Sequence, residues 1–321
     1  MNQSLYPWHY KAWQQLVQAR QTQSMPHAVL LHGPSQTGKL SFARHLTAFL
    51  LCQQPQPQGA CGGCQSCLLY QAGSHPDCTE LLGESNGVIK VDQVRALIAS
   101  LHTARHQLGY RVILVNHAEC MNNAAANSFL KTLEEPPEHT VILLISSQPG
   151  RLLPTIRSRC QQFSLPPAKT EVLAWLQQQN TSLTMIEAAR RYQLLGHAPL
   201  KLLDEAYIAD YSEQIDLWLN VLEGRQTVRY GSKPSYLRKQ LVDWSRLCSW
   251  LLKAALGQLF AGDEKLNQRL ITLAGRIQPQ ALLIFYQQLQ QSIQQLAAHN
   301  SLNEALLLDG HWVSWQRLVR V

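Results

Sequence analysis

The chain has 321 residues, a formal charge of +7, 45% hydrophobic residues and 15% charged residues. This length predicts two or three domains, and this composition excludes an intrinsically disordered protein. The basic balance is compatible with nucleic-acid or acidic-protein partners and identifies neither. Residues 1–20 lack the apolar run of a signal peptide, and no stretch of about 18 apolar residues predicts a transmembrane helix, so we expect a cytoplasmic protein.

The first half of the chain alternates apolar runs with helical patterns. Apolar residues at helical spacing predict helices that begin near Ser41, Asp92 and Asn122, and Pro136-Pro137 should end the third. Continuous apolar runs without alternation are typical of parallel strands that are covered on both faces. These runs are residues 28–32, 111–116 and 140–146, with 161–165 as a further strand. An α/β module with a parallel sheet follows from this alternation.

The β patterns disappear after Pro166-Pro167. A small helical unit is expected from residue 168 to 208, and an all-helical part from 209 to 321. Within the latter, residues 242–260 and 279–299 carry long apolar stripes at helical spacing. We therefore expect an α/β module over residues 1–167, followed by two helical domains.

A phosphate-loop pattern lies between the first predicted strand and helix. Residues 33–39 read GPSQTGK, with Gly33, Gly38 and Lys39 at the positions of GxxxxGK. The backbone N–H groups of such a loop cradle phosphates, and the lysine reaches the outer ones. The context of strand, loop and helix makes this a P-loop NTPase-like fold.

Groups that a working ATPase needs are missing around this loop. The residue after the lysine is Leu40, where Ser or Thr would hold Mg²⁺. The second strand is followed by Asn116 and His117, which are not anionic magnesium ligands, and Glu119 is displaced from the expected position. We expect no nucleotide hydrolysis by this chain, and nucleotide binding to the loop stays open.

Four cysteines follow the first helix at metal-ligand spacing: Cys52, Cys61, Cys64 and Cys67. Four thiolates on short glycine-containing loops suit a tetrahedral Zn²⁺ ion with a structural role, because they leave no open coordination position. An Fe–S cluster and a set of unliganded thiols are the alternatives. The remaining cysteines are expected in the core or at the surface.

The combination of these motifs resembles the bacterial clamp loader subunits gamma/tau and delta-prime, which belong to the AAA+ family. The CxxCxxC module stands after the first helix, residues 127–137 read NSFLKTLEEPP, and Ser158-Arg159-Cys160 is similar to the clamp loader Ser-Arg-Cys motif. The resemblance covers most of residues 1–208. It implies an AAA+ module with a zinc insertion, a helical lid and an all-α collar that packs against other subunits.

Within this family the sequence resembles the delta-prime subunits more than the gamma/tau motors. It opens with Tyr6-Pro7-Trp8, and Asn116 and His117 replace the Walker B acids. The sensor 2 arginine of the family would fall at Pro199, in residues 196–199. The resemblance therefore implies a subunit without intrinsic ATPase activity, and any DNA-directed DNA polymerase (nucleotidyltransferase) activity would belong to the holoenzyme.

The resemblance also implies a role for Arg159, the arginine of the Ser-Arg-Cys motif. In the family this arginine reaches into the ATP site of the neighbouring subunit, where it stabilises charge on the transferred phosphoryl group. The alternative is an ordinary ion pair at a strand end. Arg157 is the nearby competitor.

We thus expect a non-motor subunit that helps to load the sliding clamp onto primed DNA during replication. Its implied partners are the gamma/tau and delta subunits, with the clamp and DNA reached through the complex, and no membrane. An ATP-hydrolysing motor of the gamma/tau type and a zinc-containing DNA-binding module are the alternatives.

Overall fold

The computed structural model describes residues 5–81, 88–101, 109–195, 198–227, 237–258, 263–298 and 303–319. The chain divides into two compact units. Unit 1 is Met1–Trp175 with Ala198–Leu200, and unit 2 is Leu176–His197 with Lys201–Val321. Among the described helices, none has both the length and the apolar character needed to cross a membrane.

Unit 1 is built on a five-stranded parallel sheet with the order β2-β3-β4-β1-β5. The strands are β1 (Ala28–His32), β2 (Cys78–Leu81), β3 (Arg111–Val115), β4 (Thr140–Ser146) and β5 (Gln161–Ser164). The four strands predicted from apolar runs are confirmed, with β3 and β5 each one residue shorter than expected. The edge strand β2 had not been predicted.

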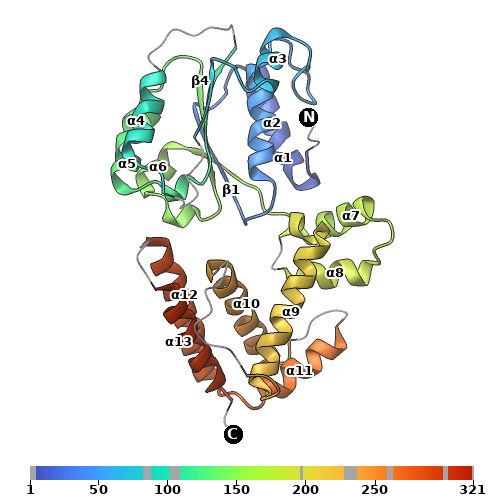
Figure 1. The fold of residues 1–321 in the computed structure, drawn as a ribbon. Helices are drawn as coiled ribbons and strands as arrows, with labels where there is room; N and C mark the ends of the chain where they lie inside the picture. The colour runs from blue at the N-terminus through green and yellow to red at the C-terminus, as the bar shows by residue number, and fades with distance from the viewer. Residues whose placement is uncertain are drawn as a thin grey trace. The chain divides into compact units, whose positions relative to one another are not determined.

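Both faces of the sheet are covered by helices (Figure 1). The side chains of α1 (Tyr10–Gln21) and α2 (Lys39–Leu51) pack with alternate strand residues such as Leu31 and Leu143. The opposite strand residues, such as Leu30 and Leu144, pack with α4 (Val91–Ser100), α5 (Asn123–Glu134) and α6 (Pro154–Arg159). Two apolar cores therefore enclose the sheet, which explains the continuous apolar runs in its strands.

Local chemistry sets the ends of the helices that flank the candidate sites. The Asn122 side chain accepts a 2.8 Å hydrogen bond from Ala125 N and caps α5, as expected. Helix α5 ends at Glu134, just before Pro136-Pro137. Helix α2 begins at Lys39, two residues earlier than expected, because Gly38 turns the chain with a φ of 79°.

Unit 2 is helical throughout its described residues, apart from loops and one bridge. After α7 (Lys169–Gln179), in which unit 1 passes into unit 2, come six further α-helices of the described chain. They are α8 (Met185–Leu194), α9 (Glu205–Leu222), α10 (Leu237–Ala255), α11 (Glu264–Ala274), α12 (Pro279–Ala298) and α13 (Glu304–Gln316). The helix predicted over 242–260 is α10, which begins five residues earlier and ends at Ala255. Residues 259 and 260 lie outside the described chain, as does residue 299, the predicted end of α12.

Aromatic residues fill the core of unit 2. The rings of Trp218 and Trp244 stack with centroids 5.5 Å apart. The indole N–H of Trp315 donates a 2.9 Å hydrogen bond to the Trp218 carbonyl. Trp244 in this core is fully buried. Trp175 of α7, which belongs to unit 1, is 8% exposed, so both tryptophans are core residues as expected.

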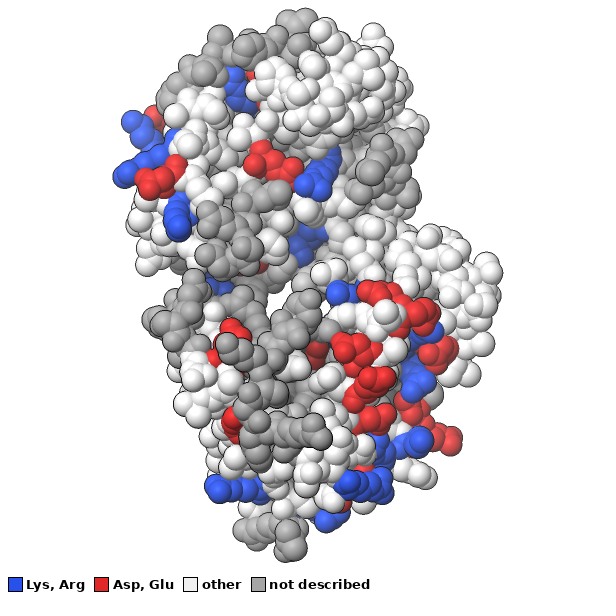
Figure 2. All heavy atoms as spheres, viewed as in Figure 1, with Lys and Arg blue, Asp and Glu red and all other residues white. Residues whose placement is uncertain are grey.

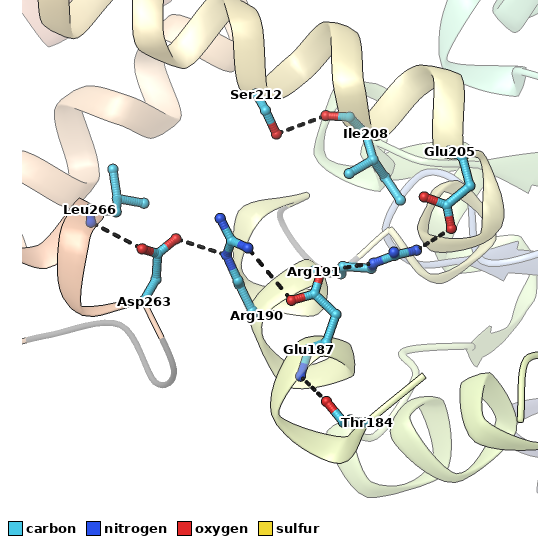
Figure 3. A network of polar contacts seen from close by, with 9 residues as sticks. All are labelled: Thr184, Glu187, Arg190, Arg191, Glu205, Ile208, Ser212, Asp263 and Leu266. Atoms are coloured by element: carbon cyan, nitrogen blue, oxygen red, sulfur yellow. Dashed lines mark hydrogen bonds and ion pairs between the residues drawn. The ribbon is translucent and has the colours of Figure 1, made fainter. Parts of the chain in front are cut away.

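Ion pairs join α8 to the starts of two other helices of unit 2 (Figure 3). Arg190 donates from Nε to Asp263 Oδ2 at 2.8 Å, while the other oxygen of Asp263 caps α11 by accepting from Leu266 N. Arg191 donates from Nη1 to Glu205 Oε1 at 2.6 Å, in the first turn of α9. These contacts fix the position of α8 within unit 2.

Candidate functional site

The phosphate loop connects β1 to α2 at the carboxyl end of a central strand. The Lys39 ammonium group donates hydrogen bonds to two carbonyls of its own loop, Gly33 O at 2.9 Å and Pro34 O at 2.5 Å. Lys39 is only 5% exposed, and this burial lowers the pKa of its ammonium group to about 8, against the opposing charge of Glu119. The lysine is therefore satisfied by the loop itself.

The N-terminal segment packs against this loop. Trp8 Nε1 donates to Thr37 O at 2.8 Å, and His9 Nε2 lies 2.9 Å from the same oxygen. Burial lowers the pKa of His9 to about 4, so the ring is neutral at neutral pH and can donate from Nε2. A side chain at Gly38 would overlap the ring of Tyr6. Residues 6–9 thus hold the loop in its conformation, a contact that the sequence alone did not reveal.

The residues expected to replace the Walker B acids lie directly after β3. Asn116 and His117 follow Val115, and the His117 side chain is 58% exposed. Leu40, in the place of the Mg²⁺-binding hydroxyl, packs against the apolar core of α1 and α2. None of these side chains is an anionic magnesium ligand.

Glu119 lies closer to this edge of the sheet than its position in the sequence suggested. It is 8% exposed, its Oε1 accepts from Ser147 N at 3.1 Å, and His117 Nδ1 lies 3.8 Å from the same oxygen. Burial alone would raise the pKa of Glu119, but the nearby His117 ring and the hydrogen bond from Ser147 N outweigh it and lower the pKa. The carboxylate therefore joins the turn after β3 to the end of β4, where it fixes the position of Ser147.

The other polar residues near the loop have structural partners. Ser146 is fully buried, and its Oγ accepts from Gln148 N at 3.1 Å. Gly196 and His197 of the sensor 2 segment lie outside the described residues. Pro199 is described and carries no charge, and the next residue, Leu200, donates its N–H to Gln36 O at 3.3 Å.

The structure brings the four predicted metal ligands together. All four Sγ atoms lie within 4.8 Å of one another. Cys52 Sγ is 3.9 Å from Cys64 Sγ, and Cys61 Sγ is 3.9 Å from Cys67 Sγ. A tetrahedral ion with Zn–S bonds of about 2.3 Å would place its sulfurs about 3.8 Å apart. The cluster therefore fits a four-thiolate metal site with little rearrangement.

Backbone N–H groups favour the thiolate form of two of the four cysteines, while burial raises the pKa of the other two, Cys52 and Cys67. Hydrogen bonds from the backbone of Gly63 and Cys64 lower the pKa of Cys61. Burial opposes ionisation of Cys64, but backbone donors from Gln53 and Cys67 outweigh it and lower its pKa to about 6. Gly62 makes the turn between the first two CxxC ligands possible with a φ of 77°. Thiolates on such a loop are ligands for soft divalent metals.

A buried hydrogen-bond chain supports the same loop. Ser66 donates to Leu51 O at 2.7 Å, and its Oγ lies 2.7 Å from His75 Nε2. His75 Nδ1 accepts from Asp77 N, which leaves Nε2 as the nitrogen that carries the proton. The serine hydroxyl thus donates to a carbonyl and accepts from histidine, so this Ser-His pair is a structural support and not a nucleophile with its base.

The cysteines outside the cluster do not extend it. Cys160 and Cys248 are buried, and burial raises the pKa of both thiols; Cys78 and Cys120 are partly exposed. These positions agree with the expectation of core or surface residues.

Arg159 is the last residue of α6 and is held by two acceptors. Its Nε donates to Glu134 Oε1 at 2.7 Å, Nη2 donates to the same oxygen, and Nη1 donates to Thr155 O at 2.9 Å. The Arg159 side chain is 33% exposed. Arg157 is oriented differently: its Nε is buried without a described hydrogen-bond partner, and its charge helps burial to lower the pKa of His32 at the end of β1.

The charged side chains in view do not form a continuous basic surface. In Figure 2, the Lys and Arg residues of the described chain lie in separate small groups, several beside Asp or Glu. The cysteine loop itself has no Lys or Arg between Cys61 and Cys67. The loop between these ligands therefore offers no basic side chain to a nucleic-acid phosphate.

Comparisons with known proteins identify relatives of this chain. A family model described as "DNA polymerase III, delta subunit" matches residues 8–169. A Pseudomonas aeruginosa protein named DNA polymerase III subunit delta' is 36% identical over 98% of each chain. The Yersinia pestis protein of that name is 43% identical over 53% of this chain and 51% of its own. A crystal structure of a gamma subunit-related protein from Thermotoga maritima aligns with a TM-score of 0.40 and 18% identity over 95% of this chain and 100% of that chain.

Proposed function

Because this chain belongs to the family of DNA polymerase III delta' subunits, we propose that it is a non-motor subunit of the clamp loader, acting in DNA replication. One observation carries the non-motor assignment. The phosphate loop is folded, yet Leu40, Asn116 and His117 offer no anionic ligand for Mg²⁺. The subunit would assemble with gamma/tau and delta subunits, and through them act on the sliding clamp and primed DNA.

We further propose that Arg159 acts in trans as an arginine finger. It lies at the end of α6 with a partly exposed guanidinium, and the chain's own phosphate loop has its lysine bound to loop carbonyls. A guanidinium beside the γ-phosphate of a neighbouring motor would stabilise the charge that develops during transfer. The chain would thus serve catalysis without hydrolysing ATP itself.

Replacing Arg159 with alanine in this subunit alone is expected to slow ATP turnover at the adjoining motor site. A loss of about 1.4 kcal/mol in transition-state stabilisation gives about tenfold slower hydrolysis there. The measurement is steady-state ATP turnover of the reconstituted clamp loader with clamp and primed DNA. Arg151→Ala is the matched control, because Arg151 is an exposed arginine whose described partner is Gln148 of its own loop. Normal assembly with unchanged turnover would leave this chain as a scaffold.

The opposite result is expected for Lys39→Ala in this chain. Lys39 donates to Gly33 O and Pro34 O, and Leu40, Asn116 and His117 offer no anionic magnesium ligand, so its removal should change turnover of the complex by less than about twofold. Titration of the isolated chain with ATP and Mg²⁺ gives an independent readout. A loss as large as that of Arg159→Ala would identify this loop as a working motor site.

We propose that the four-cysteine cluster binds a structural Zn²⁺. The support is the close spacing of the four Sγ atoms, which all lie within 4.8 Å of one another. The ion would hold the loop between α2 and α3 (Gln65–Gln71) and supply no chemistry to ATP hydrolysis.

The division of the helical part also belongs to this proposal. Residues 168–208 would form the lid and residues 209–321 the collar through which the subunits assemble. Exposed apolar side chains on α12 and α13, among them Leu283, Ile284 and Leu306, are available for such contacts in the described chain.

A further inference from the structure

We propose that Glu134 is a positioning residue for Arg159, and this inference rests on the proposed trans-acting role of that arginine. The carboxylate accepts from both Nε and Nη2 through a single oxygen, Oε1. The guanidinium is thereby held along one side, while Nη1 is tied to the Thr155 carbonyl of the preceding helical turn.

These contacts orient the arginine without using all of its donors. A guanidinium carries more N–H groups than Glu134 and Thr155 accept from Arg159 in the structure. The remaining N–H groups on Nη1 and Nη2 can be directed at phosphoryl oxygens. Because Arg159 ends α6, and its side chain is long, an unheld guanidinium would sample many rotamers and reach the phosphate less often.

Glu134 itself stands on a rigid support. It is the last residue of α5, next to Leu133, which is fully buried, and the helix is capped at its start by Asn122. Pro136-Pro137 ends the helix just beyond it. Glu134 therefore has a fixed position in unit 1, and its hydrogen bonds with Arg159 fix the orientation of the guanidinium.

The solvent exposure of the Glu134–Arg159 ion pair argues that Glu134 orients the arginine and does not stabilise the fold. The side chain of Glu134 is 48% exposed and that of Arg159 33% exposed. Ion pairs with this much solvent contact stabilise the folded chain very little. Removing the carboxylate should leave the fold intact and change only the orientation of the guanidinium.

The test compares Glu134→Ala with Glu135→Ala in the reconstituted clamp loader with clamp and primed DNA. Glu135 is the adjacent glutamate, it is exposed, and no side-chain contact is described for it. We expect Glu134→Ala to lower kcat for ATP hydrolysis at the adjoining site by about three- to tenfold, with KM changed less than about twofold, because the finger acts in the transition state. Glu135→Ala should behave as wild type, and Glu134→Gln, which keeps an acceptor oxygen, should recover part of kcat.

The double variant Glu134→Ala with Arg159→Ala should be no slower than Arg159→Ala alone, because the two residues act as a unit. Equal turnover for Glu134→Ala and Glu135→Ala would overturn the inference while leaving the finger in place. So would faster turnover, because Glu134 would then mask the arginine. If Arg159→Ala has no effect, the proposed finger role of Arg159 and this inference fail together.

Discussion

Replacing Asp77 with alanine is expected to lower the free energy of unfolding of this protein by about 3–5 kcal/mol, because it removes a buried carboxylate from beside a buried arginine. Arg111 begins β3 with a side chain that is 7% exposed, and its Nη2 lies 3.6 Å from Asp77 Oδ1. Asp77 is 2% exposed, and its carbonyl accepts from Val112 N beside the edge strand β2. Without the carboxylate, Nη1 still donates to Leu101 O, but the charge stays buried.

The chain offers a matched control for this measurement. Arg95 Nη1 and Asp92 Oδ1 lie at nearly the same separation, 3.7 Å, with side chains that are 68% and 86% exposed. Asp92→Ala should cost less than about 1 kcal/mol, since water screens the pair. Urea unfolding of both variants compares the two environments directly. Equal losses for Asp77→Ala and Asp92→Ala would show that burial does not determine the strength of the first pair.

The second large effect is expected from removal of the metal. Removal of the proposed Zn²⁺ from the cysteine cluster should unfold the loop from Cys52 to Cys67 and lower the free energy of unfolding by several kcal/mol, since the free energy of metal binding contributes to folding. The core of α1 and α2 is apolar and should survive, so the loss is local. The measurements are metal content by mass spectrometry and limited proteolysis with and without a chelator.

Cys64→Ser tests the same site without a chelator. It should lose the metal and expose the loop to protease, whereas Cys78→Ser, in β2 and outside the cluster, should keep about one ion per chain. Iron with visible absorbance in the wild-type protein would favour an Fe–S cluster instead. Wild-type protein that carries no metal and resists protease equally well with a chelator would contradict a structural ion.

The parts of unit 1 that local chemistry determines could be predicted from the sequence. Strands β1 and β4 are uninterrupted apolar runs because helices cover both faces of the sheet. Strand β2 was missed because Cys78–Leu81 is a four-residue edge strand with Glu80 exposed, and its pattern differs little from that of a loop.

The candidate sites also divide into features that local sequence determines and features that depend on tertiary packing. The phosphate loop and the cysteines could be recognised because their residues lie close together in the sequence. The contact between Glu134 and Arg159 joins residues 25 positions apart, and Trp8 reaches Thr37 across 29 positions. Such contacts depend on the packing of α6 against α5 and of the N-terminal segment against the loop, and no local spacing encodes them.

The strand order has a consequence for how the protein is made. Strand β1 has β4 and β5 as its neighbours, so a growing chain cannot complete this part of the sheet until residue 164 has been synthesised. The four cysteines have all been synthesised by residue 67. A metal-bound loop can therefore form on the ribosome while β1 is still exposed, and chaperones have a long interval in which to bind that apolar strand.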